Sequence, residues 1–267
     1  VSVRVVQHAG VAASRDWLQR FGFDAAKQPD NLTVALGTGS VTPMQMAQAY
    51  AVIANGGWLL PPLLIERITD HRGRVLQDSP TQKPDESMRV IDARNAFVMT
   101  DLLQEVTRSG TAARAQGTLK RNDIYGKTGT TNDSMDAWFA GWHPSVVAVV
   151  WIGYDTPRKL GDKETGGGLA LPVWIEYMQF ALKGLPPQKS AAKAPEGLLN
   201  AGGEWVYEEY AHGAGVTSLG LDQAPAPTAP TEDEKKSILD LFKNGTSKPC
   251  RPGCSLRATN ARKNQAR

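Results

Sequence analysis

The sequence predicts a mixed α/β (α+β) domain in which helices pack on an antiparallel sheet. Helix-start signals precede amphipathic stretches on both sides of the middle of the chain. Between residues 123 and 155 the pattern changes to alternation and short apolar runs, which is typical of strands. Of the 267 residues, 41% are hydrophobic and 21% are charged, so the chain can bury a sizeable core in one or two domains. No run of about 18 apolar residues is present, so no segment is expected to span a membrane.

Two helix starts carry capping sequences. Thr42-Pro43-Met44-Gln45 supplies an N-cap, a proline at the first helical position and a capping-box glutamine. The helix that it opens should end at Asn55-Gly56-Gly57. Asp92 is predicted to cap a second helix that ends near Gly110. A third helix should start at Pro172 and end near residue 184.

Strands are predicted in the segments between these helices. Residues 66–77 (ERITDHRGRVLQ) alternate on both sides of an Arg-Gly turn, which predicts a β-hairpin. Residues 123–131, 136–142 and 146–155 are three further strand candidates. Since the turns between them are short, these three strands can only form an antiparallel meander.

The remainder of the chain looks looser. The domain is predicted to occupy residues 1–183, and three segments follow it: a Pro/Ala/Gly-rich linker with a short strand at GEWVYEEY (184–230), a short helix (231–245) and a basic disordered tail (246–267). The net charge is +3, and the last 24 residues hold six cations and no acid. This tail either binds nucleic acid, anionic lipid or an acidic polymer, or is a solvated, disordered end.

Neither the cysteines nor the histidines predict a metal site. Cys250 and Cys254 are too few for structural zinc, and they form either a small disulfide loop or two free thiols. The four histidines show no metal-ligand spacing and are expected to be surface or packing residues: His8, His71, His143 and His212. No metal and no cofactor are therefore expected.

Residues 125–133, YGKTGTTND, combine a lysine, two glycines and three threonines. A phosphate-binding loop would need glycine where the chain has Arg121, so that interpretation is excluded. A strand fits better, and it would carry its lysine and second glycine on one face and two threonines on the other.

A strand edge of this composition suits a peptide ligand. Because Gly129 has no side chain, a peptide backbone could lie against the strand and pair with it. The hydroxyls of Thr128 and Thr130 and the charge of Lys127 would hold a carboxylate. The alternative is a glycine bulge in an ordinary strand.

The KTG triplet is one of three elements of penicillin-interacting serine enzymes. Six blocks of the chain, in order, resemble the transpeptidase domain of class A (bifunctional) penicillin-binding proteins, type 1A: VSVRVVQ, ALGTGSVTPMQMAQAYAVIANGG, SGTAARA, YGKTGTTNDSMDAWFAGWHP, VVWIGYD and ETGGGLALPVW. The resemblance implies the penicillin-binding, serine β-lactamase-like transpeptidase fold. It also implies a D,D-transpeptidase that cross-links peptidoglycan stem peptides through a serine acyl-enzyme and is the target of β-lactams.

The resemblance assigns roles to the strand residues. Lys127 and Thr130 would be catalytic, the first through its positive potential and the second through a backbone N–H in the oxyanion hole. Thr128, Gly129 and Thr130 would bind the substrate. The two aromatic residues that follow in the next strand, Trp138 and Phe139, are expected to pack rather than to bind.

The chain departs from the family in lacking its nucleophile. The family's Ser-x-x-Lys and Ser-x-Asn motifs precede KTG, whereas the only Ser-x-x-Lys here is Ser190–Lys193, in the linker. The resemblance therefore implies a C-terminal part of the domain that is inactive alone. The intact parent would add the upstream half, a glycosyltransferase domain and a membrane anchor at the periplasmic face of the bacterial inner membrane. Its partners would be stem peptides, β-lactams and other cell-wall synthesis proteins, and no nucleic acid.

Two alternatives remain open. The same fold serves β-lactamases and D,D-carboxypeptidases, and only the resemblance of the ETGGG block and the long tail argue against them. A non-catalytic peptide-binding module would use the strand edge without any chemistry, and the missing serine makes this alternative apply to the isolated chain.

Overall fold

A computed structural model describes residues 1–80, 83–188 and 193–211, and the structural statements below refer to them. The chain divides into two units after Leu219, and every described residue belongs to the first, Val1–Leu219. The helix predicted for 231–245, the basic tail, both cysteines and Ser190 lie outside the described residues.

The central element is a three-stranded antiparallel sheet in the order β3-β4-β5. Its strands are β3 (Tyr125–Thr130), β4 (Ala137–His143) and β5 (Val146–Ile152). Each strand pairs with the next along the chain, with Gly129 opposite Trp138 and Trp138 opposite Trp151. The predicted meander is therefore confirmed, and β3 lies at one edge of the sheet.

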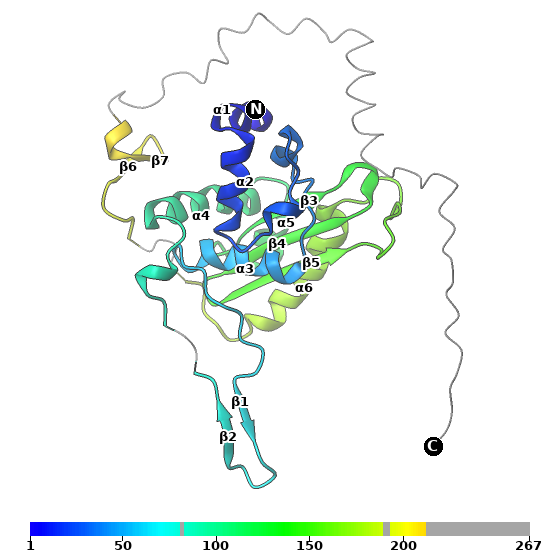
Figure 1. Cartoon of the computed structure of the whole chain (residues 1–267), viewed down its shortest axis with the longest axis vertical. Coiled ribbons are helices and arrows are strands. Elements are labelled where there is room, and N and C mark those ends of the chain that lie inside the picture. The colour runs from blue at the N-terminus through cyan, green and yellow to red at the C-terminus, as the bar shows by residue number, and fades with distance from the viewer. Residues whose placement is uncertain (81–82, 189–192, 212–267) are drawn as a thin grey trace, which may run out of the picture. The chain divides into compact units, whose positions relative to one another are not determined.

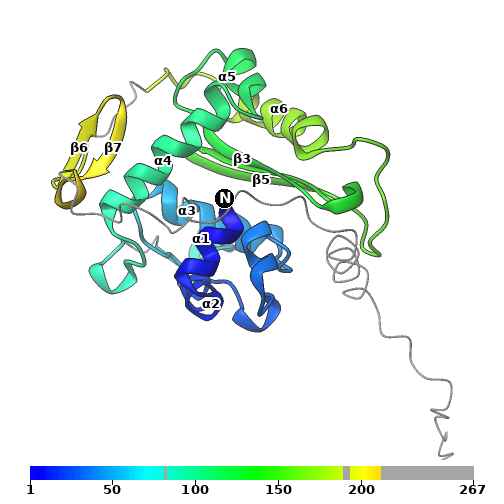
Figure 2. The same ribbon diagram turned by 90° about the horizontal axis from the view of Figure 1, so that it is seen from above.

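Helices lie on both faces of this sheet (Figure 2). On one face, called the back face, lie α5 (Ala113–Leu119) and α6 (Leu171–Ala181). On the opposite face, called the front face, lies α3 (Pro43–Ala54). The longest helix, α4 (Ala93–Arg108), contacts the edge strand β3. The other helices and helical turns are α1 (Ser2–Ala9), α2 (Val11–Gln19), η1 (Ala25–Lys27), η2 (Leu32–Leu36), η3 (Glu86–Met88), η4 (Asn132–Ser134), the π-helical η5 (Gly166–Ala170) and η6 (Glu208–Tyr210).

The predicted caps form. The Thr42 hydroxyl accepts from Gln45 N–H, and the Gln45 side chain accepts from Thr42 N–H, so α3 starts with a complete capping box. Asp92 accepts from Arg94 N–H at the start of α4. The third predicted helix differs in its first turn, because α6 continues from η5 instead of starting abruptly at its proline.

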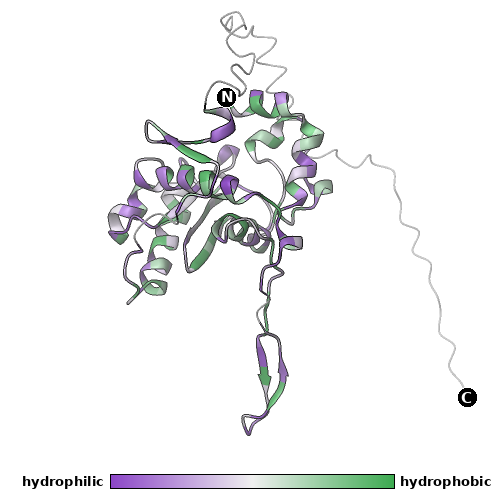
Figure 3. Ribbon diagram, turned by 90° about the vertical axis from the view of Figure 1, so that its left-hand side faces the viewer, coloured by the Kyte–Doolittle hydropathy of each residue, from purple (hydrophilic) through white to green (hydrophobic). Residues whose placement is uncertain are grey.

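Two hairpins flank this body (Figure 1). The predicted hairpin is confirmed as β1 (Arg67–Thr69) and β2 (Val75–Asp78). It extends away from the sheet (Figure 3), and its Ile68, Val75 and Leu76 are exposed. The strand predicted in GEWVYEEY is β7 (Glu204–Tyr207), which pairs with the unpredicted β6 (Leu198–Ala201). The second hairpin packs on α4 through an edge-on contact between Phe97 and Trp205.

The core behind the sheet depends on two glycines that face each other. Gly126 of β3 lies opposite Gly141 of β4, beneath the edge-on pair of Phe139 and Trp174, whose rings are 4.9 Å apart. A Cβ at Gly141 would lie 2.6 Å from the Tyr125 carbonyl oxygen and about as close to the Phe139 ring. Phe139 is fully buried here, as the expectation of a packing role requires.

Substitution of Gly141 by alanine should therefore overpack this core. We expect Gly141→Ala to lower the free energy of unfolding by about 1–3 kcal/mol. Urea unfolding followed by tryptophan fluorescence measures the change. The matched control is Gly117→Ala, since Gly117 lies in α5 and, apart from the backbone of that helix and its chain neighbours, nothing lies within 4 Å of its Cβ position. There alanine should add about 0.5–1 kcal/mol to the free energy of unfolding. Equal effects of the two substitutions would contradict the packing described.

Candidate active site

The KTG strand has one side free. No strand of the described residues pairs with the outer edge of β3. Thr131 N–H donates to the Asp136 carbonyl at 3.2 Å, and hydrogen-bonded and non-bonded pairs alternate along an antiparallel ladder. Lys127 and Gly129 therefore bond to β4, whereas the N–H and C=O groups of Thr128 and Thr130 point to the open edge.

Helix α4 covers the first part of this edge. The Gln104 side-chain amide donates to the Asn122 carbonyl at 2.5 Å, and the Thr107 hydroxyl donates to the Ile124 carbonyl at 2.6 Å. Both contacts lie ahead of β3, and α4 ends at Arg108, one residue after Thr107. The helix thus leaves the KTG part of the edge accessible.

Lys127 contributes a free positive charge at this edge. Its side chain is exposed, and its Nζ donates to the Thr128 carbonyl at 2.8 Å. Since that carbonyl points outward, the ammonium group lies over the open edge. Within the described residues no carboxylate forms an ion pair with Lys127, so an incoming carboxylate would find an unneutralised cation.

A glycine-rich turn braces the strand from behind. Gly166, at the start of η5, donates its N–H to the Thr130 hydroxyl oxygen at 3.0 Å. A Cβ at this glycine would lie 2.3 Å from the carbonyl oxygens of both Gly129 and Trp138. Only glycine can therefore pack flat against the paired backbones of β3 and β4. The ETGGG block, one of the six that resemble the family, thus has a direct structural role.

Gly129 is enclosed on its other face as well. A Cβ there would lie 3.1 Å from the Cβ of Trp138, which is closer than side chains normally approach. Trp138 is half-buried and packs against Trp151, whose indole N–H donates to Asp136 at 2.8 Å. Trp138 thus makes packing contacts, and Gly129 keeps the strand regular without a bulge.

One neighbour of the KTG strand was not predicted from the sequence. The hydroxyl of Thr111 lies 2.8 Å from the hydroxyl of Thr128. The SGTA sequence that contains Thr111 was recognised only as a block of resemblance, and a hydroxyl between two helices gives no signal by itself.

The base of the strand is fixed by a buried ionic cluster. Asp123 is 1% exposed and accepts two hydrogen bonds from the Arg121 guanidinium, at 2.7 and 2.9 Å. It also accepts from Gln188 N–H at 2.7 Å and contacts His143 Nε2 at 3.1 Å. Burial opposes ionisation of Asp123, but the bonds from Arg121 and Gln188 outweigh it and hold the pKa of the carboxyl below its usual value.

His143 is a neutral member of this cluster. Burial is the main cause that lowers its pKa. Its Nδ1 accepts from Ser145 N–H at 3.1 Å, which assigns the proton of the neutral ring to Nε2. That nitrogen lies 3.1 Å from Asp123 Oδ2 and 3.0 Å from the Arg121 guanidinium, whose charge disfavours a second proton on the ring. The expectation of a surface or packing histidine therefore missed a specific hydrogen-bonding role.

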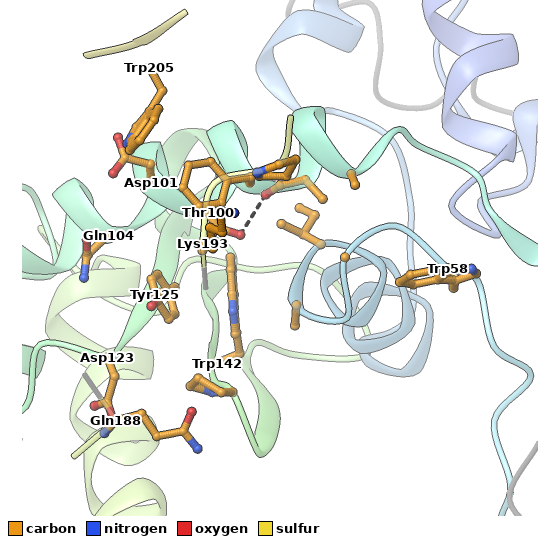
Figure 4. A pocket seen from close by; sticks show the side chains of 18 residues that line it. Trp58, Thr100, Asp101, Gln104, Asp123, Tyr125, Trp142, Gln188, Lys193 and Trp205 are labelled. Carbon is orange, nitrogen blue, oxygen red and sulfur yellow. Dashed lines mark hydrogen bonds between the residues drawn. The ribbon is translucent and has the colours of Figure 1, made fainter. Parts of the chain in front are cut away.

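A cavity of about 460 Å³ opens beside this cluster, with Asp123 and Gln188 in its lining. Residues of α3 and α4, the first residue of β3 and Trp205 of β7 form other parts of its wall. Figure 4 shows Tyr125, Trp142 and Trp205 among its walls. None of Lys127, Thr128, Gly129 and Thr130 lines it, so it does not coincide with the predicted peptide site.

Comparison with known proteins decides the family. A profile described as "Penicillin binding protein transpeptidase domain" matches residues 1–179. The chain belongs to the penicillin-binding protein transpeptidase family. It is 40% identical to "Penicillin-binding protein 1A" of Neisseria gonorrhoeae over 253 residues, which is 92% of this chain and 31% of the relative. It is 39% identical to the protein of that name from Pseudomonas aeruginosa over 246 residues, 75% of this chain and 30% of the relative.

The fold agrees. The crystal structure of penicillin-binding protein 1A from Haemophilus influenzae superposes with a TM-score of 0.70 and 32% identity, covering 77% of this chain and 37% of that one. The predicted penicillin-binding transpeptidase fold is thereby confirmed, and this chain holds part of that domain. The chain spans about a third of the length of the relatives it matches.

The buried cluster predicts a pH dependence of stability. Because the folded-state pKa of His143 is lowered, its stabilisation is present above the unfolded value near 6.5 and is lost as the pH falls below it. The lowered pKa of Asp123 adds a second loss below about pH 4. We expect the free energy of unfolding to fall from pH 7.5 to pH 5.5, as measured by urea titration.

His143→Gln is the matched variant for this pH test. Its amide can donate to Asp123 in place of Nε2–H but does not titrate. The difference in stability between the two pH values should shrink in this variant. An unchanged difference would show that His143 is not the titrating group.

Proposed function

We propose that this chain supplies the substrate-binding strand of a serine D,D-transpeptidase, which cross-links peptidoglycan stem peptides through an acyl-enzyme and is acylated by β-lactams. The observation that carries the proposal is the open edge of β3, where the exposed ammonium of Lys127 lies beside the outward backbone groups of Thr128 and Thr130. Family membership supplies the reaction class.

Each group has a task in acyl transfer. A donor peptide would pair with the outer edge of β3 as an added strand, and Gly129 would keep its path clear. Its terminal carboxylate would accept hydrogen bonds from the hydroxyls of Thr128 and Thr130 and be attracted by Lys127. The outward N–H of Thr130 would donate to the oxyanion that develops at the attacked carbonyl. Since this donor is fixed before the reaction, its stabilisation needs no rearrangement.

The nucleophile would come from another part of the longer protein. The sequence has no Ser-x-Asn, and its one Ser-x-x-Lys follows KTG. The outer edge of β5 supports this proposal. No strand of the described residues pairs with that edge, although the strand sequence VVAVVWI has neither a charged residue nor a proline to protect it. Natural proteins normally cover or charge such an edge.

The parent is proposed to be a bifunctional murein synthase of type 1A, as the names of the relatives indicate. Its glycosyltransferase domain and membrane anchor would lie outside this chain, and the transpeptidase would face the periplasm from the inner membrane. In the part of the chain that the structure describes, no helix combines the length and apolar character needed to cross a membrane. Other cell-wall synthesis proteins would be its partners.

Labelling with a fluorescent penicillin tests the proposal. The chain is incubated with the label alone and together with the upstream half of the domain, and intact mass locates the adduct. We expect no label on the chain alone and, in the mixture, a label on the upstream half. A label on the chain alone would identify a serine within it, with Ser190 the first to test. A folded mixture without any label would favour a non-catalytic peptide-binding module.

The charge of Lys127 should matter for acylation. In the complete enzyme we expect Lys127→Ala to lower the second-order rate of acylation by penicillin by about 100-fold or more, because a preorganised charge at the reacting carboxylate is lost. Stopped-flow labelling measures this rate. Lys183→Ala is the control, since Lys183 is an exposed lysine that follows α6. Equal rates for the two variants would remove Lys127 from the site.

A further inference from the structure

Thr111 lies beside the proposed site but is not part of the KTG motif, and no role has been assigned to it above. It lies in the turn between α4 and α5, 17 positions before Thr128 in sequence, and its hydroxyl is 2.8 Å from that of Thr128. Thr111 is exposed and Thr128 half-buried. The two hydroxyls therefore meet where the edge of β3 becomes accessible.

The turn that carries Thr111 is tightly built. Gly110 N–H donates to the Glu105 carbonyl, and Ala112 N–H donates to the Val106 carbonyl at 3.0 Å. A Cβ at Gly110 would lie 2.8 Å from the Cα of Val106, so only glycine fits. Because Ala112 is fully buried in the core, Thr111 is held on both sides and has little freedom to move from the strand.

Thr111 continues a series of contacts between α4 and the edge of β3. Gln104 and Thr107, one turn apart, each bond a backbone carbonyl of the chain leading into β3. Thr111 comes four positions after Thr107, past the end of α4, and its hydroxyl meets a side chain instead of the backbone. Thr111 therefore leaves the backbone of Thr128 to other partners and orients its side chain.

The number of available protons decides which of the two hydroxyls, Thr111 or Thr128, donates when a carboxylate is bound. A hydroxyl has one proton to donate and two lone pairs. When Thr128 donates its proton to a carboxylate at the open edge, it can only accept from Thr111. Thr130 is arranged in the same way, since its oxygen accepts from Gly166 N–H and its proton stays available. In this arrangement each threonine hydroxyl accepts a hydrogen bond from within the protein, Thr128 from Thr111 and Thr130 from Gly166. Each then has its own proton free to donate to a carboxylate at the open edge.

We propose that Thr111 is a positioning residue for carboxylate recognition: its hydroxyl donates to Thr128 and directs the Thr128 proton to the carboxylate of the stem peptide or β-lactam. This inference rests on the proposed function. Donation into Thr128 also polarises its hydroxyl and strengthens the bond that it gives.

The test is acylation of the complete enzyme by penicillin and by its methyl ester, which lacks the carboxylate. We expect Thr111→Val to lower the second-order acylation rate for penicillin about tenfold, the scale of one hydrogen bond to a charged group. The slower rate with the ester should change by less than about twofold, because the ester carries no charge and offers Thr128 only a weaker, neutral acceptor. Thr111→Ser should restore the rate, and Thr118→Val, at an exposed threonine of α5, should leave it unchanged.

A double-mutant cycle with Thr128→Val distinguishes positioning from a merely structural role. If Thr111 acts through Thr128, Thr111→Val should have no further effect in the Thr128→Val background. Equal losses with penicillin and its ester, or additive losses in the double variant, would overturn the inference while leaving the proposed function intact. Failure of the unsubstituted enzyme to be acylated would refute the proposed function, and this inference with it.

Discussion

The site depends on the contact between Gly166 and the paired backbones of β3 and β4. A glycine placed flat against the carbonyls of Gly129 and Trp138 fixes the back of the KTG strand, and its N–H also fixes the Thr130 hydroxyl. No side chain fits between η5 and the strand, so the strand cannot bulge backward. The outer edge of β3, with which no strand of the described residues pairs, is then the side at which a peptide can join the strand.

The two ends of the edge are controlled differently. At the base, the bidentate bond between Arg121 and Asp123 and the neutral His143 tie β3 to β4. Buried ion pairs of this kind add little net stability, because desolvation offsets the attraction, but they define a single arrangement. At the other end α4 stops, and the edge is left with an unpaired ammonium and outward N–H groups. Electrostatic stabilisation of a reaction requires polar groups that are held in place before the reaction starts. The braced backbone of β3 and the polar groups at its outer edge meet this requirement.

Much of the fold could be predicted because local signals agreed with tertiary packing. The capping box at Thr42 and the short turns around β4 specify their elements without long-range information. The roles proposed for Lys127 and Thr130 came from resemblance, and they remain predictions. What the sequence did not reveal was contact between distant segments: Thr111 with Thr128, Gly166 with Gly129, and the buried environment of His143. The β6 strand was missed although Gly202-Gly203, both at positive φ, is a recognisable hairpin turn.

The central claim is that the N–H groups of Thr128 and Thr130 point to the open edge of β3, whereas those of Lys127 and Gly129 bond to β4. Amide hydrogen exchange along β3 tests this claim most directly. In the ¹⁵N-labelled protein, the N–H groups of Lys127 and Gly129 should exchange slowly, because they bond to β4. Those of Thr128 and Thr130 should exchange faster by about 100-fold or more, since they face solvent. Protection of Thr130 upon acylation by a β-lactam in the complete enzyme would agree with its role as the oxyanion donor. Slow exchange at Thr128 and Thr130 in the free protein, or the opposite alternation, would contradict the account.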